Sequence, residues 1–138
     1  IGIWGWSFGG YLSTLSVLKG NELFKAAIAV APVTDWRFYD TIYTERYLGL
    51  PSENRSGYSE YSPVYLADRL KSDFLLIHGT SDDNVHIQHT FALQEALIKN
   101  GKTFETFIYP NKNHGISGGN TRLHLYSLMY NFWEKKLK

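Results

Sequence analysis

A serine stands between two glycines near the start of the chain, in the string Gly5-Trp6-Ser7-Phe8-Gly9. Residues 1–4 predict the end of a strand and residues 11–19 predict a helix, and a G-x-S-x-G pattern in that context is typical of a nucleophile elbow. Because the turn is sharp, we expect that positions 5 and 9 leave no room for side chains, and that Gly10 lets the helix lie close to the strand. The pattern predicts Ser7 as an exposed nucleophile. The weaker alternative is a glycine-rich turn with an incidental serine.

A serine hydroxyl is a poor nucleophile near neutral pH, so Ser7 requires a base, and that base requires an orienting carboxylate. In folds with this elbow, the acid follows a later strand and the histidine follows the last strand. Asp82 and Asp83 follow a predicted apolar strand, and His114 follows the last predicted strand. The spacing therefore predicts a triad of Ser7, one of the two aspartates, and His114. Either aspartate could orient the histidine while the other caps the next helix.

The other histidines have structural interpretations. His78 ends a strand and is expected to hydrogen-bond to the backbone. His86 and His89 are three residues apart and are expected on a solvated helix face, since no metal-ligand spacing such as H-E-x-x-H occurs. The chain has no cysteine, which excludes a thiolate nucleophile and a disulfide. We predict neither a metal nor another cofactor.

Aromatic residues gather after the second predicted strand, at a spacing of three and four: Trp36, Tyr39, Tyr43 and Tyr47. This spacing predicts one helix with the rings along one face. Ordinary packing is the alternative, but a segment that leaves the carboxyl end of a strand beside the elbow would overhang the site. We therefore expect these rings to form an apolar pocket wall.

The elements that must position these residues alternate between strand and helix. Strands are predicted at residues 24–31, 73–77 and 103–109, and a helix at residues 87–98. Residues 33–60 are an excursion from the sheet, and residues 63–70 are expected to form one short helix. The last helix is predicted from an apolar stripe at Leu123, Tyr126, Tyr130, Trp133 and Leu137. This order predicts an α/β fold with a mostly parallel sheet.

Composition narrows the function classes. The 138 residues include 14 basic and 13 acidic side chains, for a formal net charge of +1, so nothing favours binding to nucleic acid. No apolar run approaches the roughly 20 residues that a membrane-spanning helix needs. The length fits one domain or a piece of one, and the first residue, Ile1, leads us to expect a fragment.

Several longer strings resemble the dipeptidyl peptidase IV branch of the prolyl oligopeptidase family of serine peptidases, nearly from end to end. The strings are Gly5-Trp6-Ser7-Phe8-Gly9-Gly10-Tyr11, Ala31-Pro32-Val33-Thr34-Asp35-Trp36, Thr41-Ile42-Tyr43-Thr44-Glu45-Arg46-Tyr47-Leu48-Gly49-Leu50-Pro51, His78-Gly79-Thr80-Ser81-Asp82-Asp83-Asn84-Val85-His86 and His114-Gly115. Many serine hydrolases share the elbow, whereas the strings at residues 43–47 and 82–86 are specific to this branch.

The resemblance implies roles for individual residues. Ser7 would be the nucleophile, Asp82 rather than Asp83 the orienting acid, and His114 the general base. The backbone N–H of Phe8 would donate to the oxyanion, and Asn84 would contact the substrate backbone. A proline-accepting pocket would be lined by Phe8, Val33, Trp36, Tyr39, Tyr43 and Val85. Tyrosine is more familiar in the family where this chain has Phe8, a difference that should change only the polarity of the pocket.

The resemblance also implies that residues 1–138 are the C-terminal half of an α/β-hydrolase domain, without its N-terminal strands and without the family's β-propeller. Those missing parts would supply a second oxyanion donor and the glutamates that hold the substrate amino group. The implied activity is release of N-terminal X-Pro or X-Ala dipeptides through an acyl-enzyme. The isolated chain is expected to be inactive.

The alternatives are a prolyl oligopeptidase or acylaminoacyl-peptidase-like hydrolase, and a non-catalytic scaffold. The expected partners are peptides with Pro or Ala at the second position, the upstream part of the same protein and a possible second copy, but no nucleic acid. The resemblance suggests a periplasmic, secreted or membrane-anchored location.

Overall fold

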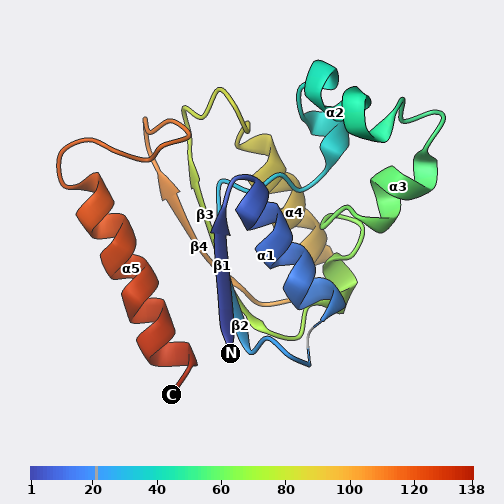
Figure 1. Cartoon of the computed structure of the whole chain (residues 1–138). Coiled ribbons are helices and arrows are strands. Elements are labelled where there is room, and N and C mark those ends of the chain that lie inside the picture. Colours follow the sequence, from blue (N-terminus) through green and yellow to red (C-terminus); the bar gives the residue numbers. More distant parts are fainter. Residues whose placement is uncertain (21) are drawn as a thin grey trace.

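Four parallel strands form a single sheet in the computed structural model, which describes residues 1–20 and 22–138. The strands β1 (Gly2–Trp6), β2 (Ala26–Val30), β3 (Asp73–Gly79) and β4 (Glu105–Tyr109) lie side by side in the order of the sequence. Helices α1 (Phe8–Lys19) and α4 (Gln88–Lys99) cover one face, and α5 (Thr121–Lys136) covers the other (Figure 1). The predicted α/β class with a parallel sheet is confirmed.

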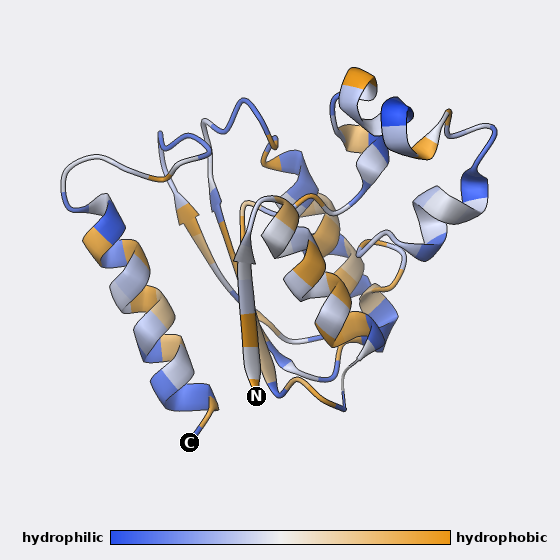
Figure 2. Cartoon of the chain, viewed as in Figure 1, coloured by the Kyte–Doolittle hydropathy of each residue, from blue (hydrophilic) through white to orange (hydrophobic). Residues whose placement is uncertain are grey.

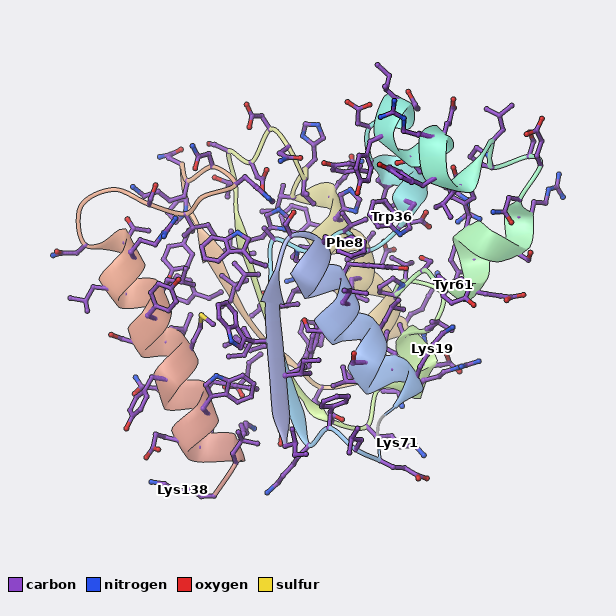
Figure 3. All side chains as sticks on the ribbon, viewed as in Figure 1. Phe8, Lys19, Trp36, Tyr61, Lys71 and Lys138 are labelled. Atoms are coloured by element: carbon purple, nitrogen blue, oxygen red, sulfur yellow. The ribbon has the colours of Figure 1, made fainter. Side chains whose placement is uncertain are left out.

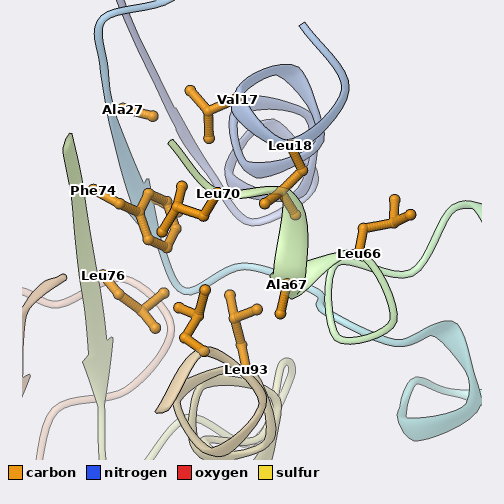
Figure 4. Packing of buried hydrophobic residues seen from close by; sticks show 11 residues of the cluster. Val17, Leu18, Ala27, Leu66, Ala67, Leu70, Phe74, Leu76 and Leu93 are labelled. Carbon is orange, nitrogen blue, oxygen red and sulfur yellow. The ribbon is translucent and has the colours of Figure 1, made fainter. Parts of the chain in front are cut away.

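The middle of the sheet is apolar on both faces because helices cover both. All five residues of β2 are fully buried, and their sequence Ala-Ala-Ile-Ala-Val is a near-continuous hydrophobic run of the kind expected for such a strand. Ala27 and Ala29 face α1 and α4, where Leu18, Phe74 and Leu93 fill the space between the layers (Figure 4). Colouring by hydropathy shows mostly polar residues in the loops at the carboxyl ends of the strands, and many apolar residues in the sheet and its helices (Figure 2).

The last helix packs with a different face from the one predicted. The side chains of α5 that enter the core are Leu125, Met129 and Phe132, whereas Leu123 is 70% exposed and Tyr130 is 62% exposed. Large apolar side chains lie on both sides of this helix, so spacing alone did not select the buried stripe. The expectation of a helix is confirmed. Of the predicted stripe, Trp133 packs against the core, but the prediction was wrong for Leu123, Tyr126, Tyr130 and Leu137, which are exposed.

The excursion between β2 and β3 is more broken than predicted. It contains a short 3-10 helix, η1 (Trp36–Phe38), followed by α2 (Thr41–Leu48) and α3 (Arg55–Glu60). The predicted single helix through the aromatic residues was wrong, because the carboxylate of Asp40 accepts the N–H of Ile42 at 2.9 Å and starts a new helix. The helix predicted over residues 63–70 is also reduced to turns and a second 3-10 helix, η2 (Ala67–Arg69).

The excursion rises from the carboxyl ends of the strands, beside the elbow that joins β1 to α1 (Figure 1). The predicted end of α1 is confirmed at Gly20, whose N–H donates to the carbonyl of Ser16 at 2.8 Å; Asn21, which shared that prediction, lies outside the described residues. Over residues 1–20 and 22–138, the helices are all too short or too polar to cross a membrane.

Candidate active site

Ser7 occupies a strained turn between β1 and α1. Its backbone has φ 58° and ψ −116°, a combination that residues other than glycine rarely adopt. The turn is held by two backbone hydrogen bonds, from the N–H of Ser7 to the carbonyl of Val30 at 2.8 Å and from the N–H of Tyr11 to the carbonyl of Ser7 at 3.0 Å. Strain of this kind persists where the surrounding structure over-determines it, and it is the expected geometry of a nucleophile elbow.

The glycines around the elbow do different work. A Cβ atom at Gly5 would overlap the backbone of Gly9, and one at Gly10 would lie 2.9 Å from the carbonyl oxygen of Val30. The expectations for Gly5 and Gly10 are therefore confirmed. A Cβ at Gly9 would meet nothing within 4 Å, so the expectation that position 9 leaves no room was wrong.

The Gly5→Ala variant is expected to be destabilised by about 1 to 3 kcal/mol, because the methyl group must push two backbone segments apart. Gly9→Ala is the matched control, and its stability is expected to stay within about 0.5 kcal/mol of the wild type. Urea unfolding of the two variants checks this difference. Equal losses in both would contradict the steric account of the elbow.

Asp82 and His114 form a hydrogen-bonded pair at the carboxyl ends of β3 and β4. The Oδ2 atom of Asp82 lies 2.7 Å from Nδ1 of His114, and the carboxylate is buried while the imidazole is part-exposed. The other oxygen, Oδ1, accepts the backbone N–H groups of Asn84 at 3.0 Å and Val85 at 2.9 Å. Asp83 is exposed. The geometry therefore places Asp82, and not Asp83, against the histidine.

The Asp82 carboxylate is held in its ionised form. Burial raises its pKa, but hydrogen bonds from His114 and His78 outweigh burial and lower the pKa below the usual range of an aspartate. At neutral pH the carboxylate is therefore charged and able to orient the imidazole of His114 and to stabilise its protonated form.

A second histidine contacts the same carboxylate. His78 is fully buried, and its Nε2 lies 3.2 Å from Oδ2 of Asp82 and 2.7 Å from the carbonyl oxygen of Val85. Its Nδ1 pairs with the hydroxyl of Thr90 at 2.7 Å. The expected bond to the backbone is confirmed, whereas the contact with Asp82 was missed in the sequence. The only signal in the sequence for this contact was that His78, at the end of a strand, precedes Asp82, in the following loop, by four residues.

The His114 loop, which follows β4, contacts the elbow after β1, although β2 and β3 lie between these two strands in the sheet. The indole N–H of Trp6, the residue before Ser7, donates to the carbonyl oxygen of His114 at 2.9 Å. Within the described part of the chain, the hydroxyl of Ser7 makes no hydrogen bond to His114. Catalytic hydrogen bonds are often long before substrate binds, so the missing bond does not exclude His114 as the base of Ser7.

An apolar cavity of about 350 Å³ opens between α1 and the excursion. Its lining consists of Phe8, Tyr11, Trp36, Tyr43, Thr44, Tyr47 and Leu48. Phe8 and Trp36 lie next to each other with ring centroids 6.0 Å apart (Figure 3). Three of the six residues expected to line the pocket therefore line this cavity, and one of them, Phe8, directly follows Ser7.

The remaining predicted pocket residues lie behind or beside the cavity. Val33 and Val85 are buried and pack in one cluster with Trp36. The hydroxyl of Tyr39 donates to the side-chain oxygen of Asn84 at 2.8 Å, which ties the excursion to the loop of the acid. The larger cavity, of about 700 Å³, lies at the amino ends of the strands and shares no residue with this site.

His89 does not lie on a solvated face, as the sequence suggested. It is fully buried, whereas His86 is exposed and precedes α4. Its Nδ1 accepts the backbone N–H of Thr34 at 3.0 Å, next to the pocket wall. Burial, with the nearby His78, lowers its pKa to about 4, so the imidazole is neutral at physiological pH.

Neutral His89 is expected to make stability depend on pH. An unfolded chain binds a proton here below about pH 6.5, but the folded chain only below about 4, so this contribution is complete above about 6.5 and is lost as the pH falls toward 4. The full difference is roughly 3 kcal/mol. The temperature of the thermal unfolding midpoint should decrease as the pH is lowered from about 7.5 to about 5. The decrease should be smaller in His89→Gln, whose amide oxygen can still accept the N–H of Thr34. An equal fall in both proteins would contradict this assignment.

Comparison with known proteins identifies close relatives over the whole chain. A profile of the Prolyl oligopeptidase family matches residues 1–138. Prolyl endopeptidase FAP of Mus musculus is 45% identical over 135 residues, which are 96% of this chain and 18% of that protein. Dipeptidyl peptidase 4 of Sus scrofa is 44% identical over the same shares of each chain.

Solved structures give the same result. The crystal structure of Porphyromonas gingivalis dipeptidyl peptidase 4 matches with a TM-score of 0.96 and 51% identity, over 99% of this chain and 19% of that one. A putative dipeptidyl aminopeptidase IV from Bacteroides ovatus matches with the same TM-score at 38% identity. The chain thus spans less than a fifth of the length of these relatives.

Proposed function

The chain belongs to the prolyl oligopeptidase family of serine peptidases, and from this premise we propose that its protein releases X-Pro or X-Ala dipeptides from the N-termini of peptides. The observation that carries the proposal is the 2.7 Å pair of Asp82 Oδ2 and His114 Nδ1, set beside a strained serine elbow. Relatives named dipeptidyl peptidase 4 and dipeptidyl peptidase 8 support the substrate class.

The proposed reaction has two halves. The Oγ atom of Ser7 attacks the carbonyl carbon of the scissile bond while His114 Nε2 takes the hydroxyl proton, which it then gives to the leaving amine. Water, deprotonated by the same imidazole, attacks the ester on Ser7. The imidazole then returns the proton to Oγ of Ser7 as the dipeptide leaves. Asp82 holds the N–H on Nδ1 throughout, since its short hydrogen bond fixes that tautomer. The backbone N–H of Phe8, at the start of α1, has no partner within the helix and donates to the oxyanion.

The aromatic cavity is the proposed site for the proline ring. Its volume of about 350 Å³ exceeds what one ring needs, and its walls are rings of Phe8, Trp36 and Tyr43. An apolar side chain is favoured there because its burial removes apolar surface from water. Asn84, oriented by Tyr39, is the proposed contact for the backbone of the substrate.

We propose that residues 1–138 are the C-terminal part of a hydrolase domain, and that upstream strands and a β-propeller complete the enzyme. Within residues 1–20 and 22–138, the first strand, β1, pairs only with β2, so its other edge is open to a further strand. A second oxyanion donor and a site for the substrate amine would come from the upstream part. Loss of one oxyanion donor costs about 3 kcal/mol, so the isolated chain is expected to be nearly inactive. A second copy as partner and a location outside the cytoplasm are proposals that rest on the resemblance.

The function is tested by hydrolysis of Gly-Pro-anilide by the full-length protein that carries this chain, with the amino group free and with it acetylated. Cleavage of the free form only is expected, because a dipeptidyl peptidase must bind the free amine. Cleavage of neither form would contradict the proposal and favour a non-catalytic scaffold.

A second candidate is an endopeptidase that cleaves after proline. It is favoured by the 45% identity with a relative named Prolyl endopeptidase FAP. The same experiment separates the two, because an endopeptidase, like an acylaminoacyl peptidase, accepts the acetylated substrate.

A further inference from the structure

The loop that carries His114 has no regular structure of its own. Ile116, two residues later, has φ +43° although it is β-branched and fully buried, and Gly118 and Gly119 also have positive φ. A β-branched residue in this region is strained and persists only where its surroundings hold it. The loop therefore depends on anchors from other elements.

One anchor comes from β1. The indole N–H of Trp6 donates to the carbonyl oxygen of His114 itself at 2.9 Å, across 108 residues of sequence. Trp6 is bonded directly to Ser7, so this contact ties the backbone of the proposed base to the backbone of the proposed nucleophile. It is the one hydrogen bond that the described side chains make directly between the elbow and this loop.

The second anchor comes from the first turn of α5. The guanidinium of Arg122 donates through Nε to the carbonyl oxygens of Gly115 and Ile116, both at 3.0 Å, and through Nη2 to Gly115 at 2.8 Å. Its centre also lies 5.2 Å from the ring of Trp6. The flat fork of arginine suits this combination of stacking and paired donation, which lysine does not reproduce. Trp6 and Arg122 thus contact each other and three consecutive carbonyl groups of the loop.

We propose that Trp6 and Arg122 are positioning residues that hold His114 at the distance from Ser7 required for proton transfer. The inference rests on the proposed function and goes beyond it, because neither side chain belongs to the triad or the pocket. Asp82 fixes the rotation of the imidazole ring of His114. The clamp, by which we mean Trp6 and Arg122 together, fixes the position of the His114 backbone. Small displacements of a general base are costly in rate, since proton transfer depends on near-contact geometry.

The test uses the full-length protein with Trp6→Phe, Arg122→Met and a matched control, Trp133→Phe. Trp6→Phe keeps a ring beneath Arg122 and removes only the N–H donor. Trp133 lies on α5, and its indole N–H makes no hydrogen bond within the described residues, so the control makes the same chemical change without removing a bond. Arg122 is exposed, and its replacement is therefore compatible with folding. Active sites are titrated with a phosphonate that reacts with serine, so that kcat is counted for each competent site.

We expect Trp6→Phe and Arg122→Met to lower kcat for Gly-Pro-anilide by about tenfold, with KM unchanged within about twofold. Trp133→Phe should retain the kcat of the wild type. A role in stability alone would lower the unfolding midpoint and the number of titrated sites but leave kcat for each site intact. If kcat for each site in both variants matches the wild type, the inference is overturned. A wild-type protein that neither titrates nor hydrolyses contradicts the proposed function itself, and the inference falls with it.

Discussion

The Ser7→Ala variant of the full-length protein is expected to hydrolyse Gly-Pro-anilide at least about ten-thousandfold more slowly than the wild type. Alanine keeps the elbow apolar and compact but removes the only atom that can form the acyl-enzyme. Residual rate would come from substrate binding and from the proposed oxyanion donor, the backbone N–H of Phe8. The measurement is kcat, with substrate binding checked by the inhibition constant of a competing dipeptide, which should be unchanged.

Ser16→Ala is the matched control for this variant. Ser16 lies on α1, the helix that follows Ser7, and its hydroxyl donates to the carbonyl oxygen of Leu12 at 2.8 Å. Its replacement should leave kcat unchanged. If Ser7→Ala retained more than a tenth of the activity, a different nucleophile would have to be sought.

The Asp82→Asn variant is expected to lower kcat by about ten-thousandfold, while Asp83→Asn should lower it by less than about threefold. An amide at position 82 carries no charge, so it cannot stabilise the imidazolium. It can also turn its NH₂ group toward His114, which stabilises the wrong tautomer of the imidazole. Asp83 is exposed and makes no hydrogen bond to His114 in the described part of the chain, so the two neighbouring aspartates should differ greatly.

The two variants are compared by kcat at neutral pH, with folding verified by circular dichroism. Loss of His78 contact is a second effect of Asp82→Asn, because the same carboxylate lies 3.2 Å from that ring. Similar losses in Asp82→Asn and Asp83→Asn would contradict the assignment of the acid.

The sequence predicted the features that depend on local pattern. The elbow was recognisable because a serine with positive φ needs small neighbours at fixed offsets, and Gly5 and Gly10 stand where backbone comes closest. The run of apolar residues in β2 predicted a strand that is covered on both faces, and all five of its residues are buried. The residue pattern alone did not decide whether Asp82 or Asp83 is the acid, because that choice depends on which of the two side chains points toward His114.

The features that escaped prediction are those set by packing between distant segments. The aromatic residues were expected on one helix, but Asp40 caps a new helix, so that Trp36 lies in η1, Tyr43 and Tyr47 lie in α2, and Tyr39 lies between the two. His89 is buried against Thr34, which lies 55 residues away in the sequence. The spacing of apolar residues along a helix gives no information about such a distant partner. The same holds for the clamp of Trp6 and Arg122, whose partners are carbonyl groups of an irregular loop.

Covalent labelling tests whether Ser7 is a nucleophile activated by His114 and Asp82. The full-length protein is treated with a fluorophosphonate that reacts with activated serines, and the adduct is located by mass spectrometry of its peptides. With this assignment, we expect one adduct, on Ser7, and its near-complete loss in both Ser7→Ala and Asp82→Asn. An adduct on another serine, or labelling of Ser7 that Asp82→Asn leaves unchanged, would contradict it.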